Sequence, residues 1–145
     1  MLGAGSLCAV EMKQGLILSK RHWQEMFDHV QRQLPLEACG LLAGTQDRVT
    51  NVIPVKNQAQ SPERFVMEPY EQLKAFDWIE SNGLELLGIF HSHPTGPATA
   101  SETDIAEAAY NVMHLIWSGE QSHWQLRGFY IENGHLIEAA LQIVE

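Results

Sequence analysis

The sequence has few cysteines and no long hydrophobic run. Only Cys8 and Cys39 occur among 145 residues, which is too few for a disulfide framework. No apolar stretch approaches the roughly 18 residues that a membrane-spanning helix needs. Residues 1–15 are broken by glycines and have no basic residue before their apolar stretch, unlike a secretory signal. We therefore expect a cytoplasmic protein without membrane association, in which residues 1–15 form a flexible N-terminal segment.

Positive charge is also scarce. Nine Lys and Arg residues face 18 Asp and Glu residues, so the formal net charge is −9. A general nucleic-acid-binding protein needs a basic face, and we therefore expect no nucleic-acid partner. Hydrophobic residues make up 45% of the chain, enough for a core, and 145 residues is the size of one domain. We predict a single domain over residues 16–145.

Hydrophobic periodicity and the positions of Gly, Pro and Asn divide this domain into strands and helices. The predicted strands are 16–18, 37–44, 48–55, 84–93, 112–117, 124–131 and 136–144. The predicted helices are 19–34, 70–81 and 101–111, and residues 57–68 form a polar loop. Asn133-Gly134, between the last two strands, is typical of a tight β-hairpin. This order predicts an α/β or α+β fold, with a mixed β-sheet flanked by about three helices.

Two histidines lie two positions apart at the end of predicted strand 84–93. Alternate side chains of an extended chain share one face, so His91 and His93 point the same way. Pro94 then ends the strand. Two imidazoles side by side are suited to binding zinc. Histidines at this spacing also occur by chance, so the pair alone does not distinguish a metal site from two ordinary core residues.

The segment after the histidines contains a possible third ligand. Residues 94–100 are rich in Gly and Pro, and Ser101 to Asp104 opens the predicted helix. Ser-x-x-Asp resembles a capping box, in which Ser101 and Asp104 serve only the start of the helix. The first turn of the helix could also direct Asp104 at the histidines, and the two interpretations are compatible. Two His and one carboxylate would leave a fourth tetrahedral position open, as in catalytic zinc sites.

An acidic residue, Glu37, begins the otherwise apolar strand 37–44. A carboxylate is costly to bury without a partner, and a zinc-bound water needs a proton acceptor. Glu37 is therefore a candidate general base. A solvated surface acid explains the same position equally well, and the residue pattern leaves both interpretations open.

These residues combine into one motif. It consists of His91-Ser92-His93-Pro94, Ser101 and Asp104, preceded by Glu37 in Glu-Ala-Cys-Gly-Leu-Leu-Ala-Gly. The motif and the order of elements over about residues 16–144 resemble the JAMM (MPN-plus) zinc metalloprotease family. The short chain is similar to the stand-alone prokaryotic members. The resemblance implies a JAMM/MPN-like architecture, which is related to that of cytidine deaminases.

The resemblance also implies a role for each residue of the motif. His91, His93 and Asp104 would bind Zn²⁺. Glu37 would take a proton from the water at the fourth position and pass it to the leaving amine. Ser101 would donate a hydrogen bond to the oxyanion of the tetrahedral intermediate. The implied reaction is zinc-dependent hydrolysis of a peptide or isopeptide bond.

A protein substrate is implied by the same resemblance. Similar enzymes act on the C-terminal tails of ubiquitin-like or sulfur-carrier proteins, for example by removing a C-terminal cysteine. Some relatives are non-catalytic MPN-like scaffolds that bind proteins, which is the alternative function for this chain. Such scaffolds usually have the ligand residues replaced, whereas all of these residues are present here. The sequence does not indicate the oligomeric state.

Overall fold

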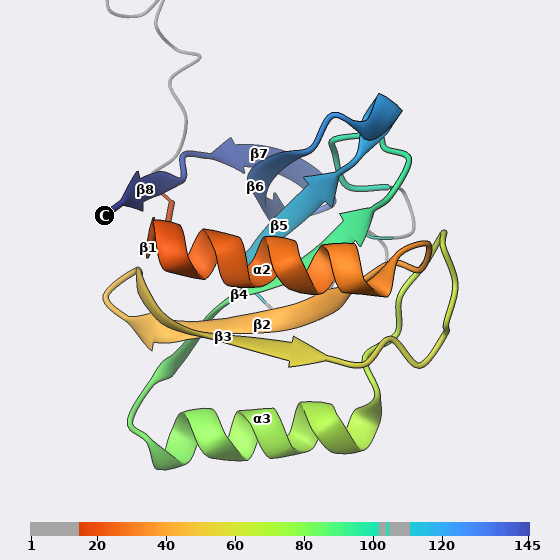
Figure 1. Cartoon of the computed structure of the whole chain (residues 1–145). Helices are drawn as coiled ribbons and strands as arrows, with labels where there is room; N and C mark the ends of the chain where they lie inside the picture. Colours follow the sequence, from red (N-terminus) through yellow and green to blue (C-terminus); the bar gives the residue numbers. More distant parts are fainter. Residues whose placement is uncertain (1–14, 102–103, 105–110) are drawn as a thin grey trace, which may run out of the picture.

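The computed structural model describes residues 15–101, 104 and 111–145 (Figure 1). Its elements are, in chain order, β1 (Ile17–Ser19), α2 (Lys20–Gln33), β2 (Cys39–Thr45), β3 (Arg48–Val55), α3 (Pro69–Ser81), β4 (Glu85–His93), β5 (Met113–Ser118), the 3₁₀ turn η2 (Glu120–Ser122), β6 (Gln125–Glu132), β7 (His135–Ala139) and β8 (Gln142–Val144). Within these ranges, none of the helices has the length and apolarity required to cross a membrane.

The described strands form one eight-stranded sheet in the order β7-β6-β5-β4-β2-β3-β1-β8. β4 pairs in parallel with β5, and β1 pairs in parallel with β3 and β8, whereas the other neighbours are antiparallel. β4 is therefore an interior strand with a hydrogen-bonded neighbour on each side. The sheet confirms the prediction of a mixed sheet in an α+β fold.

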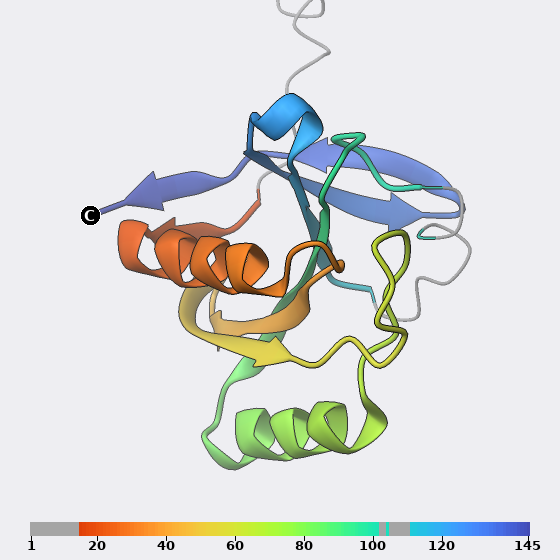
Figure 2. The same cartoon turned by 45° about the vertical axis from the view of Figure 1, so that its right-hand side comes forward.

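The two α-helices of the described residues, α2 and α3, cover opposite faces of the sheet (Figures 1 and 2). Met26 of α2 belongs to the same apolar cluster as Phe90 of β4. Ile79 of α3 belongs to a second cluster, together with Ile89 of β4. The sheet thus separates two apolar cores, and β4 contributes side chains to both.

Alternation along β4 decides which face carries the histidines. Phe90 and Ser92 face the α2 side, whereas Ile89, His91 and His93 face the α3 side. All five residues are buried. The strand therefore presents two imidazoles on one face, at the point where it ends.

Both helices begin where the local sequence provides a cap. The Ser19 side chain accepts a hydrogen bond from the N–H of His22 at 3.1 Å, and the His22 ring bonds back to Ser19. Glu68 caps α3 through its carboxylate, and Pro69 occupies the first turn, where its missing N–H costs no helical bond. Pro35, soon after α2, prevents continuation of that helix.

Gly40 lets β2 and β4 pack closely. A Cβ at this position would lie 2.4 Å from Cε2 of Phe90 and 2.7 Å from the carbonyl oxygen of Ile53. Only glycine leaves room for the Phe90 ring against β2. This contact fixes the strand that follows Glu37 against the strand that carries the histidines.

The single strand predicted over 136–144 was wrong, because β7 ends at Ala139 and β8 pairs with β1 at the other end of the chain. The helix predicted over 101–111 lies largely outside the described residues, as does the N-terminal segment 1–15 apart from Gly15. The described residues contain two α-helices of the three that we expected.

Candidate metal centre

Three side-chain atoms converge where β4 ends. His91 Nε2 lies 3.2 Å from Asp104 Oδ2, and His93 Nε2 lies 3.1 Å from the same oxygen. The two Nε2 atoms are 3.1 Å apart. The histidines are buried, and the Asp104 side chain is 13% exposed. The fold thus brings the three predicted ligands together. Their potential metal-binding atoms, the two Nε2 atoms and Oδ2, form a nearly equilateral triangle.

This triangle has the dimensions of a tetrahedral metal site. Ligands bonded to zinc at about 2.0–2.1 Å in a tetrahedron lie about 3.3 Å from one another, close to the observed 3.1–3.2 Å. Glu37 is near enough to contribute, because its carboxylate and the nitrogens of His91 and His93 lie within 4.8 Å of one another. These side chains could hold one divalent metal ion.

Glu37 lies beside the triangle, just before β2. The residue is 3% exposed, and its Oε1 has no hydrogen-bond partner among the described residues. Burial raises the pKa of Glu37 to about 8, although the nearby His93 opposes the shift. The interpretation of Glu37 as a solvated surface acid is therefore wrong. A buried carboxyl whose pKa is close to neutral can both accept and release a proton.

The charges in the triangle depend on one another. Burial alone would raise the pKa of Asp104, but hydrogen bonds from His91 and His93 outweigh it and hold this pKa well below its usual range. Burial lowers the pKa of His91. Burial also opposes protonation of His93, yet its bonds to Asp104 and Pro97 raise its pKa overall. Asp104 is thus an anion between two imidazoles of different proton affinity.

Backbone groups orient His93 and Asp104. His93 Nδ1 lies 2.9 Å from the carbonyl oxygen of Pro97, so Nδ1 carries a hydrogen, and Nε2 is the nitrogen that faces the triangle. The N–H of Ser101 donates to Asp104 Oδ2 at 2.8 Å, and the N–H of Asp104 donates to Ser101 Oγ at 3.0 Å. Asp104 therefore makes the capping contacts and also faces the histidines, as the two compatible interpretations of the sequence allow.

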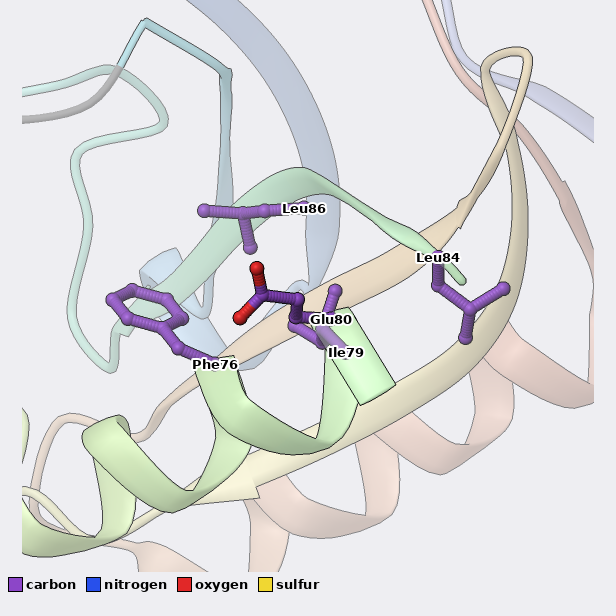
Figure 3. A pocket seen from close by; sticks show the side chains of 5 residues that line it. All are labelled: Phe76, Ile79, Glu80, Leu84 and Leu86. Carbon is purple, nitrogen blue, oxygen red and sulfur yellow. The ribbon is translucent and has the colours of Figure 1, made fainter. Parts of the chain in front are cut away.

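An apolar pocket lies elsewhere on the same face of the sheet, between α3 and the beginning of β4. It is lined by Phe76, Ile79, Glu80, Leu84 and Leu86 (Figure 3). Leu86 precedes His91 by five positions, which is about 17 Å along an extended strand. The pocket is therefore separate from the triangle of His91, His93 and Asp104.

Comparison with known proteins assigns this arrangement to a family. Residues 19–128 match Prok-JAB, which is described as prokaryotic homologs of the JAB domain. The chain belongs to the Prok-JAB family. The matched range includes all five residues of the predicted site, and it confirms the resemblance to JAMM proteins.

Relatives of this Prok-JAB chain are named as peptidases or conjugate-cleaving enzymes. The chain is 38% identical to a "Probable TtuB-protein conjugate cleaving protease" of Thermus thermophilus, over 83% of this chain and 78% of that protein. It is 36% identical to a "Desampylase" of Pyrococcus furiosus, over 76% and 81%. It is 33% identical to a "CysO-cysteine peptidase" of Mycobacterium tuberculosis, over 83% and 85%.

Solved structures share the fold. A solution structure of a Desulfitobacterium hafniense protein superposes with a TM-score of 0.81 at 38% identity, covering 90% of this chain and 93% of that one. A JAB1/MPN domain protein from Archaeoglobus fulgidus superposes with a TM-score of 0.58 at 21% identity, covering 90% and 100%. The second likeness concerns the fold alone, and it agrees with the Prok-JAB assignment.

Two residues near the candidate metal site were not identified from the sequence. The Phe65 ring stacks on His91, with ring centroids 4.5 Å apart. Asn57 donates from Nδ2 to the carbonyl oxygen of Glu37 at 3.0 Å. Both lie in the polar loop predicted at 57–68. The only sequence feature that sets Phe65 apart is that it is the single aromatic residue of this loop. Asn57 has no sequence feature that distinguishes it from an ordinary asparagine in a turn.

Replacing Ser92 with Ala should destabilise the fold. Ser92 is fully buried, its Oγ accepts from the N–H of Ala38 at 2.8 Å, and its own N–H donates to the Ala38 carbonyl. Alanine would leave the buried N–H of Ala38 without an acceptor, which costs about 1–3 kcal/mol. Urea unfolding should show a loss of this size, whereas Ser81→Ala at the exposed end of α3 should change stability by less than about 0.5 kcal/mol. Equal stability of the two variants would contradict the role of the Ser92 hydroxyl.

Proposed function

We propose that this protein uses Zn²⁺ to hydrolyse a peptide or isopeptide bond at the C-terminal tail of a ubiquitin-like or sulfur-carrier protein. The observation that carries the proposal is the buried triangle of His91, His93 and Asp104 beside Oε1 of Glu37, which has no hydrogen-bond partner among the described residues. Two imidazole nitrogens favour zinc over Mg²⁺ or Ca²⁺, because the latter ions prefer oxygen ligands.

Each residue has a role in this proposal. His91, His93 and Asp104 would hold the metal through Nε2, Nε2 and Oδ2. Bound zinc supplies a Lewis acid and a water whose pKa is about 7. Glu37 would accept a proton from the attacking water and deliver it to the leaving amine. Ser101 would donate its hydroxyl hydrogen to the oxyanion, because the bond that its Oγ accepts from Asp104 does not use that hydrogen.

The proposed substrate class comes from the relatives. The names of those from Thermus thermophilus and Mycobacterium tuberculosis refer to TtuB-protein conjugates and to CysO-cysteine. We infer a carrier protein of this kind, and removal of a C-terminal cysteine is the reaction that we favour. Cys39 is a free buried thiol, as expected in a reducing compartment, and we assign the reaction to the cytoplasm.

Metal analysis and a cleavage assay test the proposal. Protein purified without chelator should contain about one zinc ion per chain. It should release cysteine from a carrier ending in Gly-Gly-Cys, or separate the carrier from a lysine side chain, and comparing these substrates distinguishes peptide from isopeptide hydrolysis. Zinc-loaded protein that cleaves neither substrate would contradict the proposal. Protein that binds no zinc at micromolar free metal would favour the non-catalytic scaffold.

A further inference from the structure

Asn57 is a buried polar residue that the proposed chemistry does not use. It is 4% exposed and lies two positions after β3. Its Nδ2 donates to the carbonyl oxygens of Glu37 and Arg64, both at 3.0 Å. Its Oδ1 accepts from the N–H groups of Ala59 and Val66, both at 3.0 Å. The full donor and acceptor capacity of the amide is therefore used, and one of its donors reaches a residue outside the loop, Glu37.

These bonds fasten the loop 57–66 to Glu37. The N–H of Glu37 donates to the carbonyl oxygen of Ser61 at 2.9 Å, while its own carbonyl accepts from Asn57. The peptide group after Glu37 is held by Ser92 from the opposite face of the sheet. Figures 1 and 2 both show this loop beside the turn that follows α2. The main chain at Glu37 is thus fixed on both sides. Oε1 of the Glu37 side chain, by contrast, has no hydrogen-bond partner among the described residues.

The same amide also holds the segment that contains Phe65. Arg64, whose carbonyl accepts from Asn57, precedes Phe65, and Val66, whose N–H donates to Asn57, follows it. The ring of Phe65 is stacked on His91 at 4.5 Å, with an angle of 25° between the ring planes. A single buried side chain therefore connects the main chain of Glu37 to the residue that covers one face of the His91 imidazole.

We propose that Asn57 is a positioning residue that fixes the Glu37 carboxyl relative to the His91 imidazole. This inference rests on the proposed function, in which Glu37 moves a proton next to the ion that His91 helps to hold. Glu37 lies just before β2 and His91 lies in β4, and the β2–β4 ladder sets only their backbone separation. Asn57 adds a second connection, through the loop and Phe65. A displacement of about 1 Å at a reacting group can lower the rate by about 100-fold.

The first test compares Asn57→Ala with Asn82→Ala in the full-length, zinc-loaded enzyme. Asn82 is a matched control, because its Nδ2 also donates to a backbone carbonyl, that of Trp78, but at the exposed end of α3. In Asn57→Ala, kcat should fall by about 100-fold, while KM should stay within about threefold of wild type, since the lost interaction does not bind substrate. Asn82→Ala should retain the wild-type kcat. A folded Asn57→Ala enzyme with the wild-type kcat would overturn the proposal.

The second test does not depend on activity. The Glu37 N–H donates to Ser61 in the loop, so its hydrogen–deuterium exchange reports directly on the attachment. In Asn57→Ala, exchange should accelerate at Glu37 and across 58–66 together, while β5 and β6 keep their protection. A merely structural role would instead lower protection throughout the sheet. Faster exchange in the loop with no change at Glu37 would overturn the proposal.

Phe65→Leu provides a second variant if Asn57→Ala does not fold. Leucine keeps an apolar side chain in the loop and removes the ring that stacks on His91. Zinc affinity, measured by competition with a chromophoric chelator, should fall by about tenfold, as for other groups that orient a ligand. Unchanged zinc affinity would remove Phe65 from the connection. A wild-type enzyme that cleaves no carrier would refute the proposed function, whereas the exchange and zinc measurements would still decide the role of Asn57.

Discussion

Glu37→Gln should lower kcat by about 10²- to 10⁴-fold, which is the contribution typical of a positioned general acid–base residue. Glutamine keeps the size of the side chain but cannot accept a proton from the attacking water. The three atoms of the triangle come from His91, His93 and Asp104, so the zinc content should stay near that of wild type. Steady-state kinetics on a carrier–cysteine substrate and metal analysis of the same preparations measure the two quantities.

The same substitution should stabilise the metal-free protein at neutral and alkaline pH. Burial raises the pKa of Glu37 from 4.5 to about 8. The unfolded chain therefore loses this proton at a lower pH than the folded chain, and Glu37 destabilises the fold progressively from pH 4.5 to pH 8. Glutamine removes this effect. The difference in melting temperature between Glu37→Gln and wild type should be small at pH 4 and largest above pH 8.

Glu63→Gln is the matched control for Glu37→Gln. Glu63 is an exposed acid in the loop 57–66, and its charge also raises the pKa of Glu37. Its substitution should leave kcat near the wild-type value. Wild-type turnover by Glu37→Gln would remove this residue from the mechanism, whatever the zinc content.

The histidines and Asp104 could be predicted because their arrangement is mostly local. Alternation along one strand places His91 and His93 on one face, and a capping pattern places Asp104 in the following turn. The burial of Glu37 could not be read from the sequence, because it depends on β2 lying beside β4 and on the loop 57–66 covering the start of β2. The family resemblance, rather than the residue pattern, identified Glu37.

Contacts between segments that are distant in the chain also explain the other features that the sequence did not predict. The break after Ala139 follows from the pairing of β8 with β1, and no local signal within 136–144 reports a partner at the other end of the chain. Asn57 has the sequence appearance of a turn residue, yet its Nδ2 donates to Glu37, twenty positions away. Sequence patterns therefore identify candidate ligands within one local segment more readily than a residue such as Asn57, whose contacts are distant in the chain.

Removing the metal should abolish turnover and lower the melting temperature. At a free zinc concentration of 100 Kd, binding stabilises a fold by about 2.7 kcal/mol, which for a domain of this size corresponds to roughly 5–10 °C. Dialysis against a chelator, followed by calorimetry and activity measurements, tests both effects. Zinc should restore stability and turnover, and Mg²⁺ should restore neither, since imidazole nitrogens are poor ligands for it. Full activity after complete removal of the metal would contradict the proposed mechanism.

Asp104→Asn tests the proposed metal role of this residue separately from its hydrogen bonds with Ser101. Asparagine keeps an oxygen that can accept from the N–H of Ser101, but it loses the negative charge beside His91 and His93. Zinc affinity should fall by at least about 100-fold, because a direct ligand matters at least as much as the groups that orient it. At the zinc concentration that stabilises wild type by about 2.7 kcal/mol, the variant should then gain only about 0.4 kcal/mol.

The informative quantity for Asp104→Asn is the zinc-induced rise in melting temperature within each protein. The pKa of Asp104 lies well below its usual range, since hydrogen bonds from both histidines outweigh the effect of burial. The folded state therefore favours the ionised carboxylate, and the metal-free variant should itself be less stable than wild type above the ordinary pKa of an aspartate. Comparing each protein with and without zinc cancels that loss. A variant that is less stable without metal but gains as much from zinc as wild type does would show that Oδ2 serves only its hydrogen bonds with Ser101 and the histidines and is not a ligand.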